Sequence, residues 1–183
     1  LLSVSGLASA EDVKQTYQGK TLNANLVYAD GKNYGDNVVL LLHGTLTHNG
    51  RSTYADLQNN LAKEGITSLS MNLSLGLSDR RGEYDCATPH THKHTDAIAE
   101  VGVWMDWLKQ QGVKKVSVMG HSRGGNQIAW YVSEKDSDAI NKVILLAPAT
   151  GEQQSGKEYQ EKYGKPLNSV LKNAKEMVKA HLL

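Results

Sequence analysis

The feature that most constrains the fold of this chain is a serine set between glycines at residues 120–125, in the order GHSRGG. A short β-rich run, KKVSVM, precedes this segment, and the residues after it, NQIAWYV, place apolar side chains three to four positions apart. That spacing is typical of a helix with one buried face. In so sharp a turn from strand to helix, the positions two before and two after the serine have little room for a Cβ, which glycine tolerates. Gly120 and Gly124 occupy those positions, so the segment predicts strand, tight turn and helix.

The predicted turn gives Ser122 a special chemical setting. Its hydroxyl would stand clear of the backbone at the N-terminal end of the helix, where the helix dipole is positive. The backbone N–H of Arg123 would point at the same place. This arrangement is a nucleophile elbow, with His121 and Arg123 flanking the nucleophile. The alternative that the string alone leaves open is a glycine-rich turn with no chemical role.

A second segment, VVLLLHG at residues 38–44, supports the elbow. A continuous apolar run of this kind is typical of a strand that is buried on both faces of a parallel sheet. The loop at the C-terminal end of that strand is where a second oxyanion donor would come from.

With these two motifs in this order, residues 20–150 resemble the α/β-hydrolase superfamily. The resemblance implies that Ser122 is the nucleophile and that the backbone N–H groups of Thr45 (or Leu46) and Arg123 form the oxyanion hole. It implies an α/β fold with a mostly parallel central sheet and helices on both faces. In this superfamily the catalytic acid and histidine follow two later strands, which this sequence lacks. We therefore expect a fragment whose C-terminal strands are missing and whose acid and base lie beyond Leu183.

The rest of the chain predicts alternating strands and helices, which favour a parallel sheet with right-handed crossovers. Residues 11–150 would form the core domain, and the polar, helical segment 151–183 would be a cap or insertion. The expected elements are a half-exposed antiparallel edge strand at 21–28, buried strands at 38–42, 66–72 and 142–148, a helix capped by Ser52 and closed by Gly65, and a helix capped by Thr95 and closed by Gly112.

The first ten residues, LLSVSGLASA, resemble the end of a secretory signal peptide, with an apolar stretch and a small-x-small cleavage site. An apolar, disordered tail is the alternative. Export to the periplasm or the medium would place the protein in an oxidising compartment, where Cys86 has no partner in this chain.

The histidines raise the question of which base activates the serine. His43 and His121 belong to the two motifs, where local packing is the usual role, and His181 is expected in solvent. His90, His92 and His94 form a cluster that could line the rim of the pocket, bind a metal with Asp85, Cys86 or Asp96, or supply the base. We favour the rim, with no metal and no cofactor required. Asp79 also flanks the cluster in the sequence. Glu152, after the last predicted strand, is a candidate for the catalytic acid. The glycine-containing loop at 72–82 resembles a loop that shapes the pocket in the superfamily.

Composition narrows the partners. The net charge is +1 and the sequence pI is about 8.0, and no basic run interleaved with aromatics is present, so nucleic acid is not expected as a partner. No apolar stretch approaches the roughly 20 residues needed to span a bilayer. The sequence predicts a serine hydrolase, similar to esterases and lipases, that cleaves an ester, thioester or similar acyl bond of a small molecule. The alternative is a non-catalytic member of the fold that binds a ligand or partner. The sequence leaves the oligomeric state open.

Overall fold

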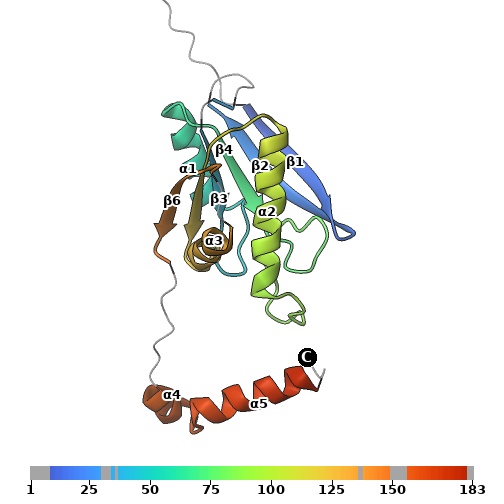
Figure 1. The fold of residues 1–183 in the computed structure, drawn as a ribbon, viewed down its shortest axis with the longest axis vertical. Coiled ribbons are helices and arrows are strands. Elements are labelled where there is room, and N and C mark those ends of the chain that lie inside the picture. The colour runs from blue at the N-terminus through green and yellow to red at the C-terminus, as the bar shows by residue number, and fades with distance from the viewer. Residues whose placement is uncertain (1–8, 30–33, 36, 136–137, 149–155, 181–183) are drawn as a thin grey trace, which may run out of the picture. The chain divides into compact units, whose positions relative to one another are not determined.

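The structure is a computed structural model that describes residues 9–29, 34–35, 37–135, 138–148 and 156–180. The chain divides into two compact units, residues 1–149 and residues 150–183, and each is described by itself. The first unit carries a six-stranded sheet and three helices (Figure 1). Its elements are β1 (Ser9–Tyr17), β2 (Lys20–Tyr28), β3 (Val38–Leu42), α1 (Ser52–Lys63), β4 (Ser68–Asn72), α2 (His94–Gln110), β5 (Val116–His121), α3 (Arg123–Glu134) and β6 (Ile140–Leu146).

The strands lie in the order β1-β2-β4-β3-β5-β6. β3 is parallel to β4 and β5, and β5 is parallel to β6, whereas β2 is antiparallel to both β1 and β4. The fold class predicted from the sequence is therefore confirmed: an α/β fold with a mixed, mostly parallel central sheet. The carboxyl ends of the parallel strands meet at one edge of the sheet, which is where binding sites form in such folds.

Helices cover both faces of this sheet. Leu40 pairs in register with Leu69 and Val118, and this row belongs to the hydrophobic core with Trp104 of α2 and Ile128 of α3. Alternate residues of a strand point to opposite faces, and the neighbouring row faces α1, whose Gln58 bonds to Ser68. α2 and α3 therefore lie together on one face and α1 lies on the other (Figure 1).

One strand was missed by the sequence analysis. β1 pairs with β2 along its whole length, so the segment predicted as the antiparallel edge lies inside the sheet and β1 forms the edge. Along β1 the odd-numbered residues from Glu11 to Tyr17 are half-buried, but only Val13 and Tyr17 among them are apolar. Hydrophobic alternation is therefore too weak in this segment to reveal the strand.

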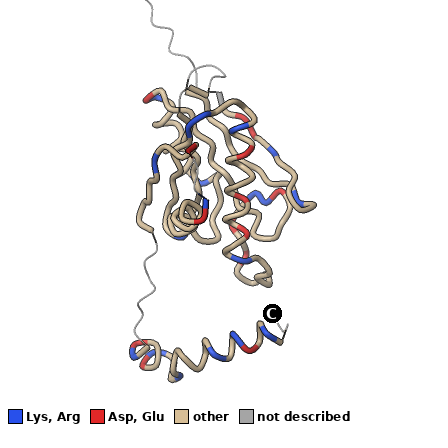
Figure 2. The backbone as a smooth tube through the Cα atoms, viewed as in Figure 1, with Lys and Arg blue, Asp and Glu red and all other residues tan. Residues whose placement is uncertain are grey.

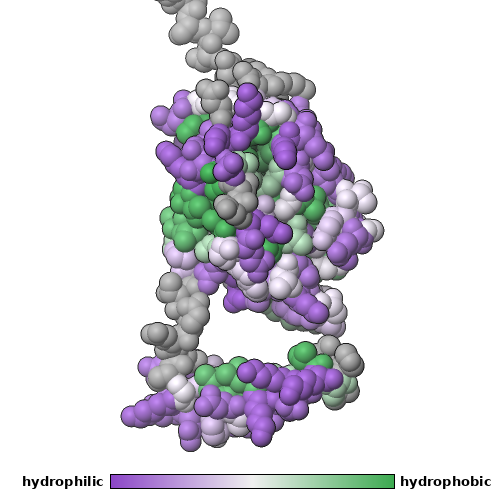
Figure 3. Space-filling view, viewed as in Figure 1, coloured by the Kyte–Doolittle hydropathy of each residue, from purple (hydrophilic) through white to green (hydrophobic). Residues whose placement is uncertain are grey.

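The strand expected at 142–148 also differs from expectation. β6 begins and ends two residues earlier, and its residues from 141 onward are exposed instead of buried. It pairs with β5 on one side only, and no other strand of the described residues pairs with its free edge. Figure 3 shows apolar side chains gathered at this edge, where Val143, Ile144, Leu145 and Leu146 lie.

The boundaries of α1 and α2 agree with the sequence to within two residues. α1 begins at Ser52 and α2 at His94, so Arg51 and Lys93 occupy the N-cap positions that were expected for Ser52 and Thr95. Gly65 and Gly112 follow the two helices with φ of +75° and +85°, the left-handed conformation that ends a helix cheaply at glycine.

The second unit contains α4 (Gly156–Tyr163) and α5 (Leu167–Lys179), and neither helix has a buried residue. The segment is helical as predicted, and its role as a cap stays a prediction. Export also stays a prediction: residues 1–8 lie outside the described residues, and β1 includes Ser9 and Ala10 of the predicted signal segment. Among the described residues, no helix combines the length and apolar character needed to span a bilayer.

Candidate active site

The turn between β5 and α3 has the geometry expected of a nucleophile elbow. Ser122 lies between the last residue of β5 and the first residue of α3, with φ 53° and ψ −123°. Such a conformation is costly for a residue with a side chain and persists only where the surroundings enforce it. A Cβ at Gly120 would collide with the carbonyl group of Gly124, and a Cβ at Gly124 would collide with the carbonyl oxygen of His43. Both glycines are thus required by the close approach of backbone to backbone.

Two backbone hydrogen bonds hold the elbow in place. The N–H of Ser122 donates to the carbonyl oxygen of Leu146 at the end of β6, at 2.9 Å, and the N–H of Gly125 donates to the Ser122 carbonyl oxygen, also at 2.9 Å. The serine is therefore fixed between the edge strand and the first turn of α3.

The loop after β3 is locked to the elbow through Tyr54, a buried residue of α1. The N–H of Gly44 donates to the hydroxyl of Tyr54 at 3.0 Å, and that hydroxyl lies 3.0 Å from Nδ1 of His121. One hydroxyl thus contacts both the loop after β3 and the residue that precedes Ser122. A Cβ at Gly44 would lie 3.3 Å from the Ser122 Cβ, so the loop passes directly beside the serine.

His43, the residue after β3, also holds this loop in place through buried hydrogen bonds. It is 1% exposed, its Nδ1 lies 2.8 Å from the carbonyl oxygen of Gly44, and its Nε2 accepts from the N–H of Leu73 and from Arg80, both at 3.1 Å. Burial is the main reason that the pKa of His43 falls to about 4. The ring is therefore neutral and fully bonded, which leaves it no lone pair for Ser122.

Arg80 is a buried cation that the sequence analysis did not single out. Its guanidinium donates to the carbonyl oxygens of Leu73 and Gly82 and to Oδ1 of Asn72. The amides of Asn72 and Asn23 in turn donate to the carbonyl oxygen of Arg80. Burial lowers the pKa of Arg80 to about 10, which leaves it charged at neutral pH. The only sequence signal was an arginine within the 72–82 loop. Three of its partners belong to that loop, whereas His43 and Asn23 lie far from it along the chain.

The sequence analysis names three backbone N–H groups as candidate oxyanion donors. Those of Thr45, Leu46 and Arg123 donate to no acceptor within the part of the chain that the structure describes. Leu46 has φ 53°, in the left-handed region, so the loop is neither strand nor helix at this residue. Its carbonyl oxygen accepts the N–H of Tyr84 at 2.8 Å. All three residues line the same cavity.

The cavity has a volume of about 220 Å³. It lies among the loop after β3, the loop after β4, the histidine segment and the N-terminal turns of α2 and α3. The lining residues are Gly44, Thr45, Leu46, Leu73, Leu75, His90, His92, Lys93, His94, Asp96, Ala97, Glu100, Arg123 and Gln127. The three clustered histidines thus all contribute to the lining, as does the 72–82 loop.

In the histidine cluster, the rings of His90 and His92 pack edge-to-face against the ring of Tyr84. The ring of Tyr84 lies 4.9 Å from that of His90 and 5.2 Å from that of His92, between centroids, and the two imidazoles are 5.3 Å apart. His94 instead contacts Arg123. Among the described residues, no three His, Cys, Asp or Glu side chains are grouped as a metal site would require, and Cys86 is an exposed free thiol.

The acidic residues near the cluster have local roles. Asp85 accepts the N–H of Ala87, and Asp96 accepts the N–H of Lys93 at the start of α2. Asp79 lies on the surface and bonds to Lys14 and Arg81. Glu152 and His181 lie outside the described residues.

Glu100 is a buried carboxylate in the cavity lining that sequence reasoning missed. It is 4% exposed, and it accepts the N–H and the hydroxyl of Ser74. Burial raises its pKa above the usual range for a glutamate. A signal was available, since Glu100 lies between Ala97 and Trp104 on the helical stripe of α2 that faces the core.

No hydrogen bond links the hydroxyl of Ser122 to a histidine among the residues that the structure describes. The described part of the chain thus brings together the elbow, the candidate oxyanion donors and the cavity, but no base.

Comparison with known proteins identifies the family. The α/β hydrolase fold family matches residues 37–182, which is most of the chain, and the protein belongs to this family. No curated protein matches the sequence significantly.

Solved structures share the fold at low sequence identity. Est1E from Butyrivibrio proteoclasticus is 19% identical with a TM-score of 0.60, over 75% of this chain and 50% of its own. Dienelactone hydrolase from Anabaena variabilis is 21% identical with a TM-score of 0.64, over 77% and 64%. The esterase Pf2001 from Pyrococcus furiosus is 20% identical with a TM-score of 0.60, over 90% and 60%. This chain therefore spans between half and two thirds of the length of these structures.

Proposed function

We propose that this protein is a serine hydrolase that cleaves an ester, thioester or similar acyl bond of a small molecule through an acyl-enzyme on Ser122. The observation that carries the proposal is the conformation of Ser122, φ 53° and ψ −123°, between two glycines that admit no Cβ. A serine without a chemical role gains nothing from so strained a position. The hydrolase and esterase names of similar structures agree with the proposal.

The proposed reaction follows from the groups around the serine. The Ser122 oxygen attacks the acyl carbon, and the negative charge that develops on the carbonyl oxygen is stabilised by the N–H of Arg123 and that of Thr45 or Leu46. The alcohol or thiol then leaves with a proton, and water hydrolyses the acyl-enzyme to the free acid. Backbone donors held by Tyr54 and His43 need no reorganisation during this step.

A base must remove the proton of Ser122, because a serine hydroxyl is a weak nucleophile on its own. We propose that the base is a histidine outside the described residues, held by an acid that is also outside them. His43 and His121 are committed to the loop contacts given above. The full-length protein is therefore the right material for tests of activity.

The first prediction is that Ser122 is the residue that becomes acylated. A fluorophosphonate probe should label the full-length protein at Ser122, as located by mass spectrometry, and Ser122→Ala should abolish labelling and lower kcat by at least about 10³-fold. Ser133→Ala is the matched control, because its hydroxyl bonds locally within α3, and it should be labelled like wild type. A folded full-length protein that is not labelled would contradict the proposal and favour a ligand-binding role.

A further inference from the structure

The side chain of Arg123 holds an unusual position for a cation. Its Nε donates to the hydroxyl of Thr45 at 3.1 Å, and its Nη1 donates to Nε2 of His94 at 2.8 Å. Neither partner is a carboxylate. By contrast, Arg51 pairs with Glu83 and Arg81 pairs with Asp12. Arg123 forms no ion pair with a carboxylate among the described residues.

This cation is adjacent to the proposed reaction centre. Arg123 directly follows Ser122, and it lines the cavity together with Thr45 and His94. Hydrogen bonds to Thr45 and His94 fix the guanidinium through Nε and Nη1, and its remaining N–H groups, including both on Nη2, have no protein acceptor among the residues that the structure describes. A planar guanidinium with free N–H groups matches the geometry of a carboxylate, which it can bind through two parallel hydrogen bonds.

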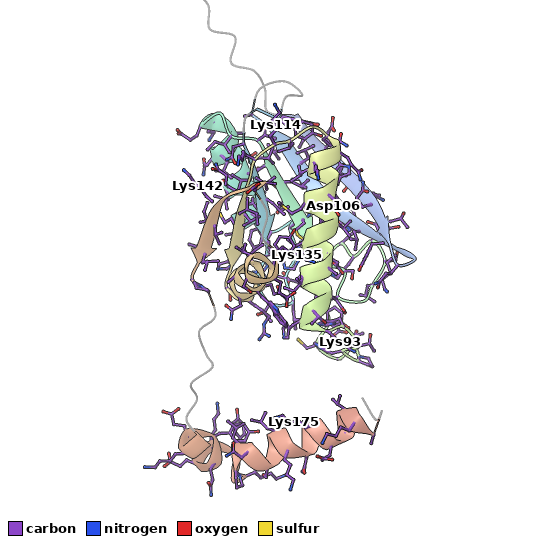
Figure 4. The ribbon with its side chains drawn as sticks, viewed as in Figure 1. Lys93, Asp106, Lys114, Lys135, Lys142 and Lys175 are labelled. Carbon is purple, nitrogen blue, oxygen red and sulfur yellow. The ribbon has the colours of Figure 1, made fainter. Side chains whose placement is uncertain are left out.

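The cavity lining holds one further cation, and its two carboxylates are engaged by backbone donors. Lys93 lines the cavity at the start of α2, where Figure 4 labels it. The two acidic residues of the lining are occupied by backbone donors: Asp96 accepts the N–H of Lys93 at 2.8 Å, and Glu100 accepts the N–H of Ser74 at 2.9 Å. Elsewhere in the core unit, basic and acidic residues are interspersed along the backbone (Figure 2).

We propose that Arg123 binds a carboxylate carried by the acyl part of the substrate, so that the enzyme acts on short monoesters or monothioesters of dicarboxylic acids. The inference rests on the proposed function, because it assigns a substrate class to the same site. Arg123 would then contact both ends of the acyl group. Its backbone N–H would bind the reacting carbonyl oxygen, and its guanidinium would bind the distal carboxylate. A volume of about 220 Å³, below the range of roughly 300–1,000 Å³ typical of ligand pockets, suits a short acyl chain.

The test compares esters that differ only in the charge of the distal group. Full-length protein is assayed with monoethyl succinate and its neutral counterpart ethyl succinamate, and with the corresponding glutarate pair, with ethanol release as the measurement. The ethyl leaving group keeps attack by the substrate's own carboxylate slow, and Ser122→Ala gives the background rate. We expect kcat/KM to be at least about tenfold higher for the acid ester of one pair, as a charge-assisted contact provides.

Substitution identifies the residue responsible. Arg123→Gln should reduce the ratio of acid to amide kcat/KM to near one. Arg123→Lys should keep part of the ratio, because lysine has the charge but not the planar pair of N–H donors. Arg81→Gln removes an equal charge from a surface pair with Asp12 and should leave the ratio unchanged.

The outcomes separate the two proposals. A wild-type ratio within twofold of one for both pairs, or a ratio unchanged in Arg123→Gln, would overturn the carboxylate site while the hydrolase proposal stands. Failure of both acid esters with a protein that the fluorophosphonate labels at Ser122 would have the same meaning. Absence of both turnover and labelling would overturn the proposed function and this inference with it.

Discussion

At the scale of single residues, the site depends on polar groups that are buried and fully bonded. His43 holds the loop that carries the candidate oxyanion donors, and it can do so only while neutral, because both of its ring nitrogens are committed. Protonation of Nε2 would set a positive ring against the Arg80 guanidinium at 3.1 Å and against the Leu73 N–H. The charge state of this one ring therefore couples pH to the stability of the loop.

The corresponding prediction concerns stability in mild acid. The pKa of His43 is lowered from 6.5 to about 4 in the folded state, so between these values the unfolded chain binds more protons than the folded one. The contribution of neutral His43 to the free energy of unfolding is complete above pH 6.5. It decreases by up to about 3 kcal/mol as pH falls towards 4. Denaturant unfolding from pH 7 to 4 should show the advantage of wild type over His43→Gln shrinking by that amount.

A control and an independent measurement protect this prediction. His90→Gln changes an exposed ring and should track wild type across the same pH range. In wild-type protein, the NMR signals of the His43 ring should not titrate between pH 8 and 5.5. A ring that protonates near pH 6.5, or equal pH slopes for wild type and His43→Gln, would show that His43 has no such role.

What the sequence reveals at this scale depends on how local each requirement is. Ser122, Gly120 and Gly124 could be predicted because a tight turn constrains residues within two positions of the serine. Tyr54 and Arg80 could not, because His121 and His43, the partners that tie them to the site, lie 67 and 37 residues away along the chain and nothing near them in the sequence marks a buried hydrogen bond. The oxyanion donors stay predictions from the family resemblance, at positions that the structure shows to be accessible from the cavity.

At the scale of elements, the elbow depends on close contact between α3 and the end of β3. Gly124 in the first turn of α3 lies against the carbonyl oxygens of both His43 and Leu42. A side chain at this position must push the helix away from the loop that carries Thr45 and Leu46. Helix, strand and oxyanion loop are therefore coupled through a single glycine.

Gly124→Ala should separate this contact from ordinary helix propensity. We expect the free energy of unfolding to fall by about 1–3 kcal/mol, as for other overpacked sites, and kcat/KM to fall about a hundredfold through misplacement of the loop. Gly102→Ala is the matched control within α2, where the added Cβ would lie 3.8 Å from the Tyr131 ring. It should stabilise the protein by about 0.5–1 kcal/mol, because alanine favours a helix over glycine. A Gly124→Ala variant that behaves like Gly102→Ala would refute the contact.

At the scale of the whole molecule, the sequence predicted the fold class and the alternation of strands and helices, because these follow from periodicity over many residues. It did not predict that β1 forms one edge of the sheet or that β6, at the other edge, is exposed. β1 was missed because its half-buried face carries Glu11 and Gln15, and β6 reads as a buried strand because its composition is that of one. Burial of β6 is a property of what packs on it, and composition alone does not contain that information.

The exposure of β6 leads to the last prediction. A long apolar edge strand with a free row of backbone groups is a template for pairing with another chain. Val143 and Leu145, on one face of β6, are each 43% exposed, and the neighbouring Ile144 and Leu146 are exposed on the other. We expect the purified 183-residue chain to associate with itself through this edge, so that its weight-average sedimentation coefficient rises with concentration. Leu145→Lys should keep the chain monomeric, since an edge lysine opposes such pairing. Leu77→Lys provides the control, because Leu77 is exposed to a similar extent, 45%, but lies alone in a loop, where a single apolar residue has little effect. Concentration-independent sedimentation of the wild-type chain, or equal association of both lysine variants, would rule out the β6 edge as the site of pairing.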